Sequence, residues 1–558
     1  MSLSLIKINF TTRGVMICSR MNVTDAIAKI LAEEGVEHLI GFPSNPLFDD
    51  DAAEEAGVRP IVVRQERTGA HILDGIARIT SGEQVEAFAC QHGPGTENSV
   101  GGIAQAYAES APIVAIPAGY SRAKTNTDPK FSSLINYQAV SKTTEQLTDP
   151  DAVEETFRRA FQTARNGRQR PAVVEVPKDV FHLDAPDFDY ETTSSTRAGP
   201  DPHAISEAAD ALLDADLPVL YAGQGVHYAK AWEPLTELAE LLEAPVATSL
   251  NGKSAFPEDH PLSLGAGSKS EPRQLNHFIH EADVLFGIGC SFTKTAYGIT
   301  PPTEDNTLIH STNDPGDVDK DYKSDLAVIG DAKLVLEALV DEIGNRVGDD
   351  TDFGRYDDVT AEIEEVEQAW LDDWSDVLES DETPINPYRV VKELDETLDK
   401  DEVVATADAG NARDFMAPFF EVTEPLSYLG WGKTTQLGYG LGLMMGAKLS
   451  KPEKTCVHVM GDGAIGMTGM DFETAVREDI PIIAVVLNNF EMASYDTPFS
   501  GHYADFAESM GGYGERIEDP DNVADAIERA VEKTKEGTPV LLEFLTAQYT
   551  KLSRPDLE

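Results

Sequence analysis

The stretch GDGAIGMTGMDFETAVREDIPIIAVVLNN, from Gly461 to Asn489, decides the fold of the C-terminal part of the chain. The apolar run before it, TCVHVM, and the run PIIAVVL inside it are predicted to be buried strands, because both are rich in Val and Ile and almost continuously apolar. Between the two runs, apolar side chains from Met470 to Val476 have the spacing of a helix. The pattern predicts one βαβ unit, with parallel neighbouring strands and a right-handed crossover.

Polar residues follow both predicted strands, with Asp462 after the first and Asn489 after the second. Open α/β sheets bind ligands at this carboxyl edge. A carboxylate and an amide oxygen suit Mg²⁺, which completes its octahedron with water and phosphate oxygens. The glycines beside Asp462 let the backbone approach a diphosphate, and the N–H groups that open the next helix can hold it. A turn and a helix cap would explain each feature alone, but their spacing favours a metal and diphosphate site.

Length and composition indicate a globular protein of several domains. The chain has 558 residues, too many for one hydrophobic core, which predicts two to four domains. It is 41% apolar and has no uninterrupted apolar stretch of membrane-spanning length. Its four cysteines are far apart and show no CxxC or CxxH spacing. This pattern argues against a disulfide framework and a zinc site, and it predicts a cytoplasmic protein.

The charge balance is strongly acidic, with 98 acidic and 44 basic residues and a net charge of −54. Such a surface repels nucleic acid and anionic membranes, because affinity for phosphate comes mainly from Lys and Arg. Self-repulsion should destabilise the fold at low salt, whereas at molar salt a Debye length of about 3 Å screens it. We therefore interpret the charge as halophilic adaptation to a salt-rich cytoplasm, in preference to an ordinary acidic enzyme.

Apolar runs alternate with helical patterns along the chain, which predicts an α/β protein with three doubly wound α/β domains. A polar stretch at residues 184–202 has the composition of a linker. The predicted segments are residues 21–185, 200–345 and 384–558 for the domains, and residues 346–383 for an acidic helical linker.

Residues 1–20 differ from the rest of the chain because they contain three basic residues and no acid. They lack the apolar core of a signal peptide. A regular amphipathic helix follows Met21, and we expect Thr24 to cap it. We expect residues 1–20 to be a non-native or disordered extension, with Met21 as the true start.

The stretch from Gly461 to Asn489 resembles the thiamine diphosphate motif, in which GDG is followed by NN after a spacer of this length. Further segments are similar to the acetolactate synthase family: Val62 to Gly82, His92 to Ile116, Arg170 to Val180 and Thr435 to Ser450. The resemblance extends over essentially residues 21–544. It implies three α/β domains, of which the first binds the aminopyrimidine ring of the cofactor, the last binds its diphosphate, and the central one joins them.

The resemblance implies a set of residues for the metal and the cofactor. Mg²⁺ would be held by Asp462, by the side chain of Asn489 and by the main-chain carbonyl of Glu491. Leu437 occupies the place of the large apolar residue that holds the two cofactor rings in a V. The residues implied around the diphosphate are Gly410, Asn411, Gly461, Gly463 and Ala464.

Two further residues would lie at the reacting end of the cofactor. At the place of Glu66 the family has a Glu that hydrogen-bonds the pyrimidine ring and promotes proton removal from thiazolium C2. From the sequence alone, an ion pair with Arg64 or Arg67 would explain Glu66 as well. His92 lies where the family approaches the reacting carbon, although a lone His is more often structural.

Three departures from the family concern specificity. GCSFTKTAYG at residues 289–298 replaces an ARFDDR-like run, which makes FAD doubtful. FEMASYDTPFSGHY at residues 490–503 lacks the Arg and Trp that the synthases place near the second substrate. GYGLG at residues 438–442 replaces the usual GYGLP. The cofactor motifs are intact, while the elements that choose the substrate differ.

We therefore weigh three functions. The first is acetolactate synthase-like carboligation of a small 2-oxo acid after decarboxylation. The second is a related 2-oxo acid decarboxylase or C–C lyase of phosphonopyruvate, phenylpyruvate or hydroxyacyl-CoA type. The third is a non-catalytic paralogue, which the joint presence of Glu66, Asp462 and Asn489 disfavours. We expect a homodimer or homotetramer with sites at the subunit interface, acting without nucleic acid or membrane.

Overall fold

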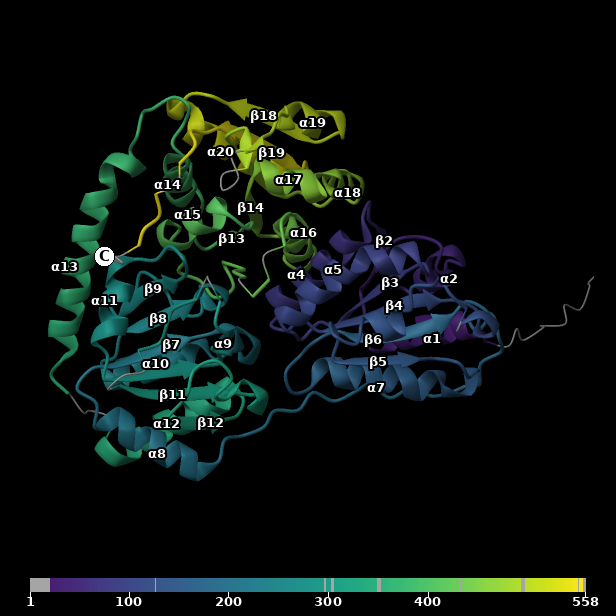
Figure 1. The fold of residues 1–558 in the computed structure, drawn as a ribbon, viewed down its shortest axis with the longest axis horizontal. Helices are drawn as coiled ribbons and strands as arrows, with labels where there is room; N and C mark the ends of the chain where they lie inside the picture. Colours follow the sequence, from purple (N-terminus) through teal and green to yellow (C-terminus); the bar gives the residue numbers. More distant parts are fainter. Residues whose placement is uncertain are drawn as a thin grey trace, which may run out of the picture.

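The computed structural model describes residues 21–125, 127–295, 298–302, 306–348, 353–431, 433–434, 436–492, 497–549 and 551–554. The N-terminal extension lies outside these residues. Three α/β units are visible in Figure 1, the N-terminal one at the right, the central one at the lower left and the C-terminal one at the top. Each is built on one parallel sheet, as the sequence predicts. Among the described residues, no helix combines the length and the apolar character needed to cross a membrane.

The N-terminal sheet has the order β2-β1-β3-β4-β6-β5. Alternate residues of its strands face two separate cores, as Leu39 and Ile40 of β1 do, so helices cover both faces. Its strands are β1 (His38–Gly41), β2 (Arg59–Val62), β3 (Glu86–Cys90), β4 (Ile113–Gly119), β5 (Thr143–Gln146) and β6 (Ala172–Pro177). Its helices are α1 (Val23–Glu33), α2 (Pro46–Asp49), α3 (Ala52–Glu55), α4 (Glu66–Ile79), α5 (Pro94–Ala108), α6 (Ser133–Asn136) and α7 (Val153–Arg165).

The cap of α1 differs from the prediction. Asn22, not Thr24, is the N-cap, and its side chain accepts a hydrogen bond from the backbone N–H of Asp25 in a capping box. The hydroxyl of Thr24 instead donates to the carbonyl of Phe181, 3.0 Å away. Asn and Thr are both good caps, and here the tertiary contact of Thr24 decides between them.

The central sheet has the order β12-β11-β10-β7-β8-β9. A long helix, α13, runs along the edge of the molecule at the left of Figure 1 and places Trp370 and Trp374 in the core of the C-terminal unit. The strands are β7 (Pro218–Ala222), β8 (Val246–Ser249), β9 (Ser263–Gly267), β10 (Val284–Ile288), β11 (Thr307–Thr312) and β12 (Leu326–Ile329). The helices are α8 (Pro202–Leu213), α9 (Gln224–Ala229), α10 (Trp232–Leu242), α11 (Arg273–Glu281), α12 (Ala332–Val347) and α13 (Tyr356–Leu378).

The C-terminal sheet has the order β13-β14-β15-β19-β18. The predicted βαβ unit is present, with β14 and β15 parallel and adjacent. Its strands are β13 (Val403–Ala407), β14 (Thr455–Gly461), β15 (Ile483–Asn488), β18 (Tyr513–Ile517) and β19 (Val540–Leu545), and β16 (Glu491–Met492) pairs with β17 (Thr497–Pro498). Its helices are α14 (Pro387–Thr397), α15 (Asn411–Phe419), α16 (Tyr439–Ser450), α17 (Asp462–Thr468), α18 (Phe472–Arg477), α19 (Tyr503–Ser509) and α20 (Val523–Lys535).

The helix predicted between β14 and β15 is divided into α17 and α18 by a short 3-10 turn, Gly469–Asp471. Met470 lies in this turn and is 45% exposed, contrary to its expected place on the buried helix face. Asp471 accepts hydrogen bonds from the backbone N–H of Arg64 and from the hydroxyl of Thr474. The turn is therefore held by a contact with the N-terminal unit.

Helices α4 and α16 join the N-terminal and C-terminal units. Because α16 is buried on nearly all sides, its sequence is apolar all round. The backbones of the two helices approach so closely that glycine is required. A Cβ on Gly75 would lie 2.1 Å from the carbonyl oxygen of Leu443, and one on Gly446 would lie 2.0 Å from that of Ile72. This contact fixes the carboxyl edges of the two sheets relative to each other.

Candidate active site

Asp462 lies where β14 ends and α17 begins, and it is only 5% exposed. Its Oδ1 accepts a hydrogen bond of 2.8 Å from the N–H of Gly463, while its Oδ2 is buried without a hydrogen-bond partner. Burial raises the pKa of Asp462 to about 6, opposed by the N–H of Gly463 and by the nearby N–H groups of Glu491 and Phe490, which donate to the side chains of the Asn pair. The two ends of the motif therefore meet at one carboxylate.

The Asn pair after β15 is used in two ways. Asn488 is buried, and its side chain donates to Glu543 on β19 over 2.7 Å. Asn489 is half-buried in the turn that leads to β16, and its Oδ1 accepts from the N–H of Glu491 over 3.1 Å. Asn489, and not Asn488, is thus free of the sheet interior, as the metal prediction requires.

This arrangement fits a hard cation. A buried carboxylate oxygen without a partner is costly unless something binds it. The described residues include no cluster of three or more His, Cys, Asp or Glu side chains able to hold a metal. The predicted Mg²⁺ set is of another kind, since it combines the carboxylate of Asp462 with the amide of Asn489 and the carbonyl of Glu491. The unpaired Oδ2 of Asp462 is the observation that favours it.

The glycines predicted around the diphosphate border open space. A Cβ added to Gly410 or Gly461 would meet no atom within 4 Å, and one on Gly463 would touch the ring of Phe499 at 3.3 Å. Gly410 has a φ of +95° and is the N-cap of α15. The side chain of Asn411 donates to the carbonyl of Tyr549 over 3.1 Å, so it is turned toward the C-terminal segment.

Leu437 lies beside α17. It is half-buried against a small apolar cluster that includes Ala464 and Ile465 of that helix. The carbonyl of the next residue, Gly438, accepts a hydrogen bond of 2.6 Å from the hydroxyl of Thr468. The structure thus brings the residue predicted to support the cofactor rings next to the helix that begins at Asp462.

Glu66 is the first residue of α4, directly after the carboxyl end of β2, and is 5% exposed. Its Oε2 accepts a hydrogen bond from the side chain of Asn98, 3.2 Å away. The sequence alone also allowed an ion pair of Glu66 with Arg64 or Arg67. Among the described residues neither arginine forms such a pair, so this alternative is wrong. Arg64 pairs with Glu473, and Arg67 donates to the carbonyl of Met467. Glu66 is therefore held by Asn98 and not by an ion pair with either arginine.

His92 lies in the turn between β3 and α5, at the same edge of the N-terminal sheet as Glu66. The turn and Glu66 are close, since a Cβ on Gly95 would lie 3.3 Å from Oε1 of Glu66. The His92 ring packs edge-on against Tyr120, with centroids 4.8 Å apart. Burial lowers the pKa of His92, and the charges of Lys178 and Lys130 lower it further. The imidazole is therefore neutral near pH 7.

The start of α4 is tied to the segment after α17 within the same chain. The backbone N–H of Arg64 donates to Asp471 over 2.7 Å, and Arg67 donates to the carbonyl of Met467 over 2.9 Å. No hydrogen bond or ion pair joins Glu66 to Asp462 among the residues described. Within one chain the start of α4 thus contacts the end of α17, while the two carboxylates have no direct contact.

Asp408 was missed by the sequence reasoning. It follows β13 and is completely buried, two residues before Gly410. Its carboxylate accepts hydrogen bonds from the backbone N–H groups of Ala409, Gly438 and Gly440. An acid in the run ADAGNA was visible in the sequence, but its partners lie about thirty residues further along.

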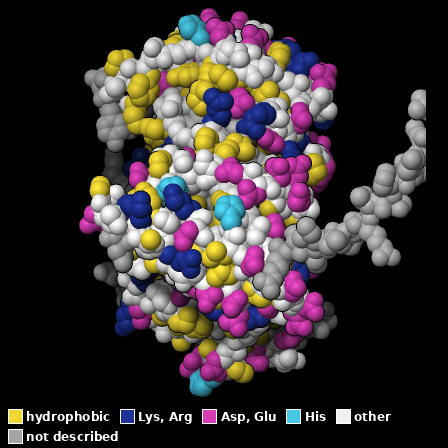
Figure 2. All heavy atoms as spheres, turned by 90° about the vertical axis from the view of Figure 1, so that its right-hand side faces the viewer, with side chains coloured by type: hydrophobic (Ala, Val, Ile, Leu, Met, Phe, Trp, Pro, Cys, Tyr) yellow, Lys and Arg dark blue, Asp and Glu magenta, His cyan; other side chains and the backbone are white. Residues whose placement is uncertain are grey.

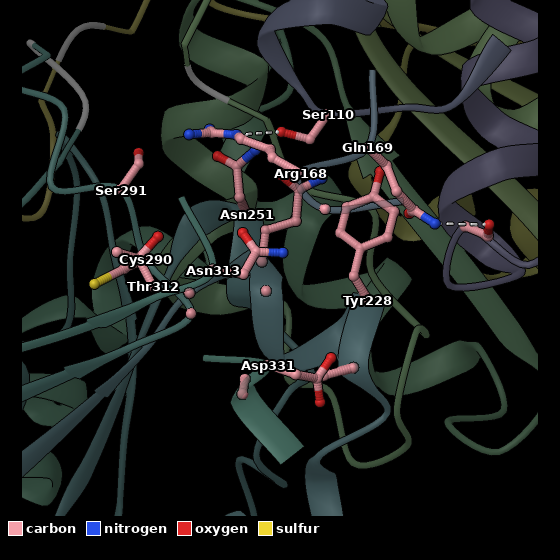
Figure 3. A pocket seen from close by; sticks show the side chains of 18 of the residues that line it. Ser110, Arg168, Gln169, Tyr228, Asn251, Cys290, Ser291, Thr312, Asn313 and Asp331 are labelled. Atoms are coloured by element: carbon pink, nitrogen blue, oxygen red, sulfur yellow. Dashed lines mark hydrogen bonds between the residues drawn. The ribbon is translucent and has the colours of Figure 1, made fainter. Parts of the chain in front are cut away.

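A cavity of about 870 Å³ lies elsewhere, between the central and N-terminal units. None of the predicted site residues lines it. The segment from Gly289 to Thr295, which departs from the family, does line it, and Phe292 stacks on Tyr221 there. Figure 3 shows Arg168, Cys290 and Asp331 around this space. This cavity therefore lies beside the segment whose departure from the family makes FAD binding doubtful, and it is separate from the site around Asp462.

The basic residues of this cavity are largely neutralised. Arg168 forms an ion pair with Asp317, Arg165 forms one of 2.8 Å with Glu34, and Arg197 lies 3.9 Å from Asp331. Lys433 also lines the cavity, and burial lowers its pKa to about 8. Paired cations offer little to the diphosphate of a dinucleotide, so the residues present fit FAD poorly.

Three family models match this chain. The thiamine pyrophosphate enzyme N-terminal TPP binding domain matches residues 21–148, the central domain 205–339, and the C-terminal TPP binding domain 408–544. A probable acetolactate synthase large subunit of Methanocaldococcus jannaschii is 31% identical, covering 92% of this chain and 90% of the relative. The Escherichia coli K12 acetolactate synthase isozyme 3 large subunit is 27% identical, covering 93% and 94%. The sulfoacetaldehyde acetyltransferase of Alcaligenes xylosoxydans xylosoxydans is 28% identical, covering 94% and 93%. The chain therefore belongs to the thiamine pyrophosphate enzymes that resemble acetolactate synthase large subunits.

Proposed function

We propose that this protein is a Mg²⁺-dependent carboligase, which decarboxylates a small 2-oxo acid and joins the remaining carbons to a second carbonyl compound, as acetolactate synthases do. The observation that carries the proposal is the buried, unpaired Oδ2 of Asp462 at the end of the thiamine diphosphate motif. Glu66, Asp462 and Asn489 are all present, which argues against a non-catalytic paralogue.

The diphosphate end would be held by the C-terminal unit. Asp462, Asn489 and the carbonyl of Glu491 would bind Mg²⁺, whose charge offsets that of the diphosphate. Gly410 and Gly461 leave room for close approach, because neither carries a side chain in the open space.

The reacting end would be held between Leu437 and the N-terminal unit. Bound thiamine diphosphate supplies a carbanion and an electron sink for decarboxylation. Glu66 would hold the pyrimidine ring by a hydrogen bond and favour the movement of a proton to and from it. His92 is neutral and so can accept or donate a hydrogen bond to substrate without adding charge.

We propose that the site is completed in a homodimer or homotetramer, with Glu66 of one chain facing Asp462 of another. Large apolar side chains at the end of α17, in the turn that follows it and after β15 are exposed: Met467, Met470, Phe490 and Phe499. Exposed apolar groups around a charged site favour coverage by a partner. A symmetric dimer would form two enclosed sites with one contact, and enclosure protects a carbanion from water.

The choice between carboligation and C–C cleavage is tested by product analysis. Pyruvate, Mg²⁺ and thiamine diphosphate are incubated with the protein in molar KCl, and the products are resolved. We expect acetolactate. Acetaldehyde and CO₂ alone would identify a decarboxylase, the second candidate, which the different segment at residues 490–503 favours. Absence of turnover with pyruvate and with a panel of other 2-oxo acids would contradict both.

A further inference from the structure

One buried carboxylate links the two segments predicted to hold the cofactor. Oδ1 of Asp408 accepts hydrogen bonds from the N–H of Ala409 at 2.8 Å and of Gly438 at 2.9 Å. Its Oδ2 accepts one from the N–H of Gly440 at 3.2 Å. Ala409 directly precedes Gly410, and Gly438 directly follows Leu437. The position of Leu437 relative to the diphosphate segment therefore depends on Asp408.

A histidine on the neighbouring strand supports this carboxylate. Nε2 of His458, on β14, lies 3.2 Å from Oδ2 of Asp408, and both side chains are 0% exposed. The backbone N–H of Asp408 also donates to the carbonyl of Val459 over 2.7 Å. A Cβ on Gly440 would lie 2.3 Å from Nε2 of His458, so glycine at this position is what lets the ring reach the carboxylate. The sequence thus makes room for the pair at the cost of a helix-favouring residue.

We propose that Asp408, oriented by His458, is a positioning residue that sets the spacing between residues 409–411 and residues 437–440, and so the fit of thiamine diphosphate; this inference rests on the proposed function. A fully buried carboxylate needs several donors to be stable, and four surround this one. The donors come from both cofactor segments, so the same bonds that stabilise the charge fix the distance between them. A carboxylate with only a structural role would have no need to join these two segments.

The test is calorimetric titration of thiamine diphosphate into the purified wild-type chain and its variants, with Mg²⁺ in molar KCl. Asp408→Asn places an amide N–H₂ toward the donors of Gly440 or Gly438. Loss of one charge-assisted bond should weaken cofactor binding about tenfold or more. His458→Ala should weaken binding too, whereas His458→Gln should restore most of it, because its amide can donate to Oδ2.

The matched control is Glu258→Gln in the central unit, which alters another buried ion pair. Lys253 and Glu258 lie 2.6 Å apart, and Lys253 is only 1% exposed. This variant should lower the melting temperature but leave cofactor affinity unchanged. The comparison separates a general loss of stability from a loss of positioning.

Wild-type affinity in Asp408→Asn or His458→Ala, with a lowered melting temperature as in the control, would overturn the inference. If Asp408→Asn does not fold, the His458 variants carry the test, and equal affinity of His458→Ala and His458→Gln would overturn it. A wild-type chain that fails to bind thiamine diphosphate would instead overturn the proposed function.

Discussion

The carboxyl edge of the C-terminal sheet and the cavity beside the central sheet differ in how completely their charges are paired. At the first, Oδ2 of Asp462 is buried without a partner and glycines border open space. At the second, 870 Å³ of space is available, but Arg168 is already paired with Asp317. A large volume needs no ligand, whereas an unpaired buried charge does. The comparison therefore favours the electrostatically incomplete edge of the C-terminal sheet as the functional site.

The difference between the two regions is tested most directly by removing one acidic side chain from each. Asp462→Ala should abolish retention of thiamine diphosphate, because the diphosphate loses the metal that offsets its charge. Asp331→Ala, beside the cavity, removes the cap of α12 and the ion pair with Arg197, and should cost about 1 kcal/mol of stability without loss of cofactor. Bound cofactor is measured after gel filtration with Mg²⁺. Unchanged retention in Asp462→Ala would sink the metal assignment.

Glu66 provides the next largest effect, on the chemistry alone. Glu66→Gln keeps the shape of the side chain but lacks the charge that favours a protonated pyrimidine. Cofactor binding and folding should survive, while exchange of the C2 proton, followed by NMR in D₂O, should slow by at least about a hundredfold. Exchange at the wild-type rate would show that Glu66 does not act on the pyrimidine.

Mixing two inactive variants tests whether the site lies between chains. A mixed dimer of Glu66→Gln and Asp462→Ala subunits would carry both lesions in one site and neither in the other. Subunit exchange, verified by mass, should therefore restore up to about half of the activity of a wild-type dimer. If no activity returns after verified exchange, either each site lies within one chain or the two residues do not share a site.

Much of the fold was predictable because buried central strands are continuous apolar runs. The short paired strands β16 and β17 were not predicted, and three strands of the parallel sheets were missed: β5 (TTEQ), β9 (SLGAG) and β18 (YGERI). Each of these three is an edge strand of its sheet. β5 and β18 are half-buried along most of their length, so their sequences lack the apolar run of a central strand. β9 is largely buried, but Ser and Gly take the place of large apolar residues in it. The edge strands β2, β12 and β13 do contain apolar runs, so an edge position alone does not hide a strand.

The candidate site was predictable where a motif places its residues close together in sequence. Asp462 and Asn489 are separated by one βαβ unit, whose geometry forces their strands together. Asp408 could not be predicted, because its importance comes from Gly438 and His458, which only the folded chain brings to it. A pattern in sequence reveals contacts across one crossover more readily than contacts among three separate segments.

Salt should have a smaller and more general effect, through the surface. Acidic side chains are spread over the face shown in Figure 2 and are not gathered in one patch. Lowering KCl from molar to about 0.1 M lengthens the Debye length to about 10 Å, so repulsion among these groups grows. The melting temperature should fall, and cofactor should stabilise the protein at both salt concentrations. A melting temperature independent of KCl would contradict halophilic adaptation.

Added FAD should have the smallest effect on the melting temperature. This prediction tests whether the cavity beside the central sheet binds a ligand. The purified protein should be colourless, because the cations that could meet a dinucleotide diphosphate are held by Asp317 and Glu34. Of the other lining cations in the described part of the chain, Arg197 lies 3.9 Å from Asp331, and Lys433 has a pKa lowered to about 8, so little positive charge is left for a diphosphate. A ligand that binds only the folded state stabilises it by RT ln(1 + [L]/Kd), so FAD well below its dissociation constant shifts melting negligibly. We therefore expect no flavin absorption and no change in melting temperature with added FAD, beside a clear rise with thiamine diphosphate and Mg²⁺. A stoichiometric yellow chromophore would show that paired charges do not exclude a ligand from this cavity, and the criterion that separates the two regions would fail.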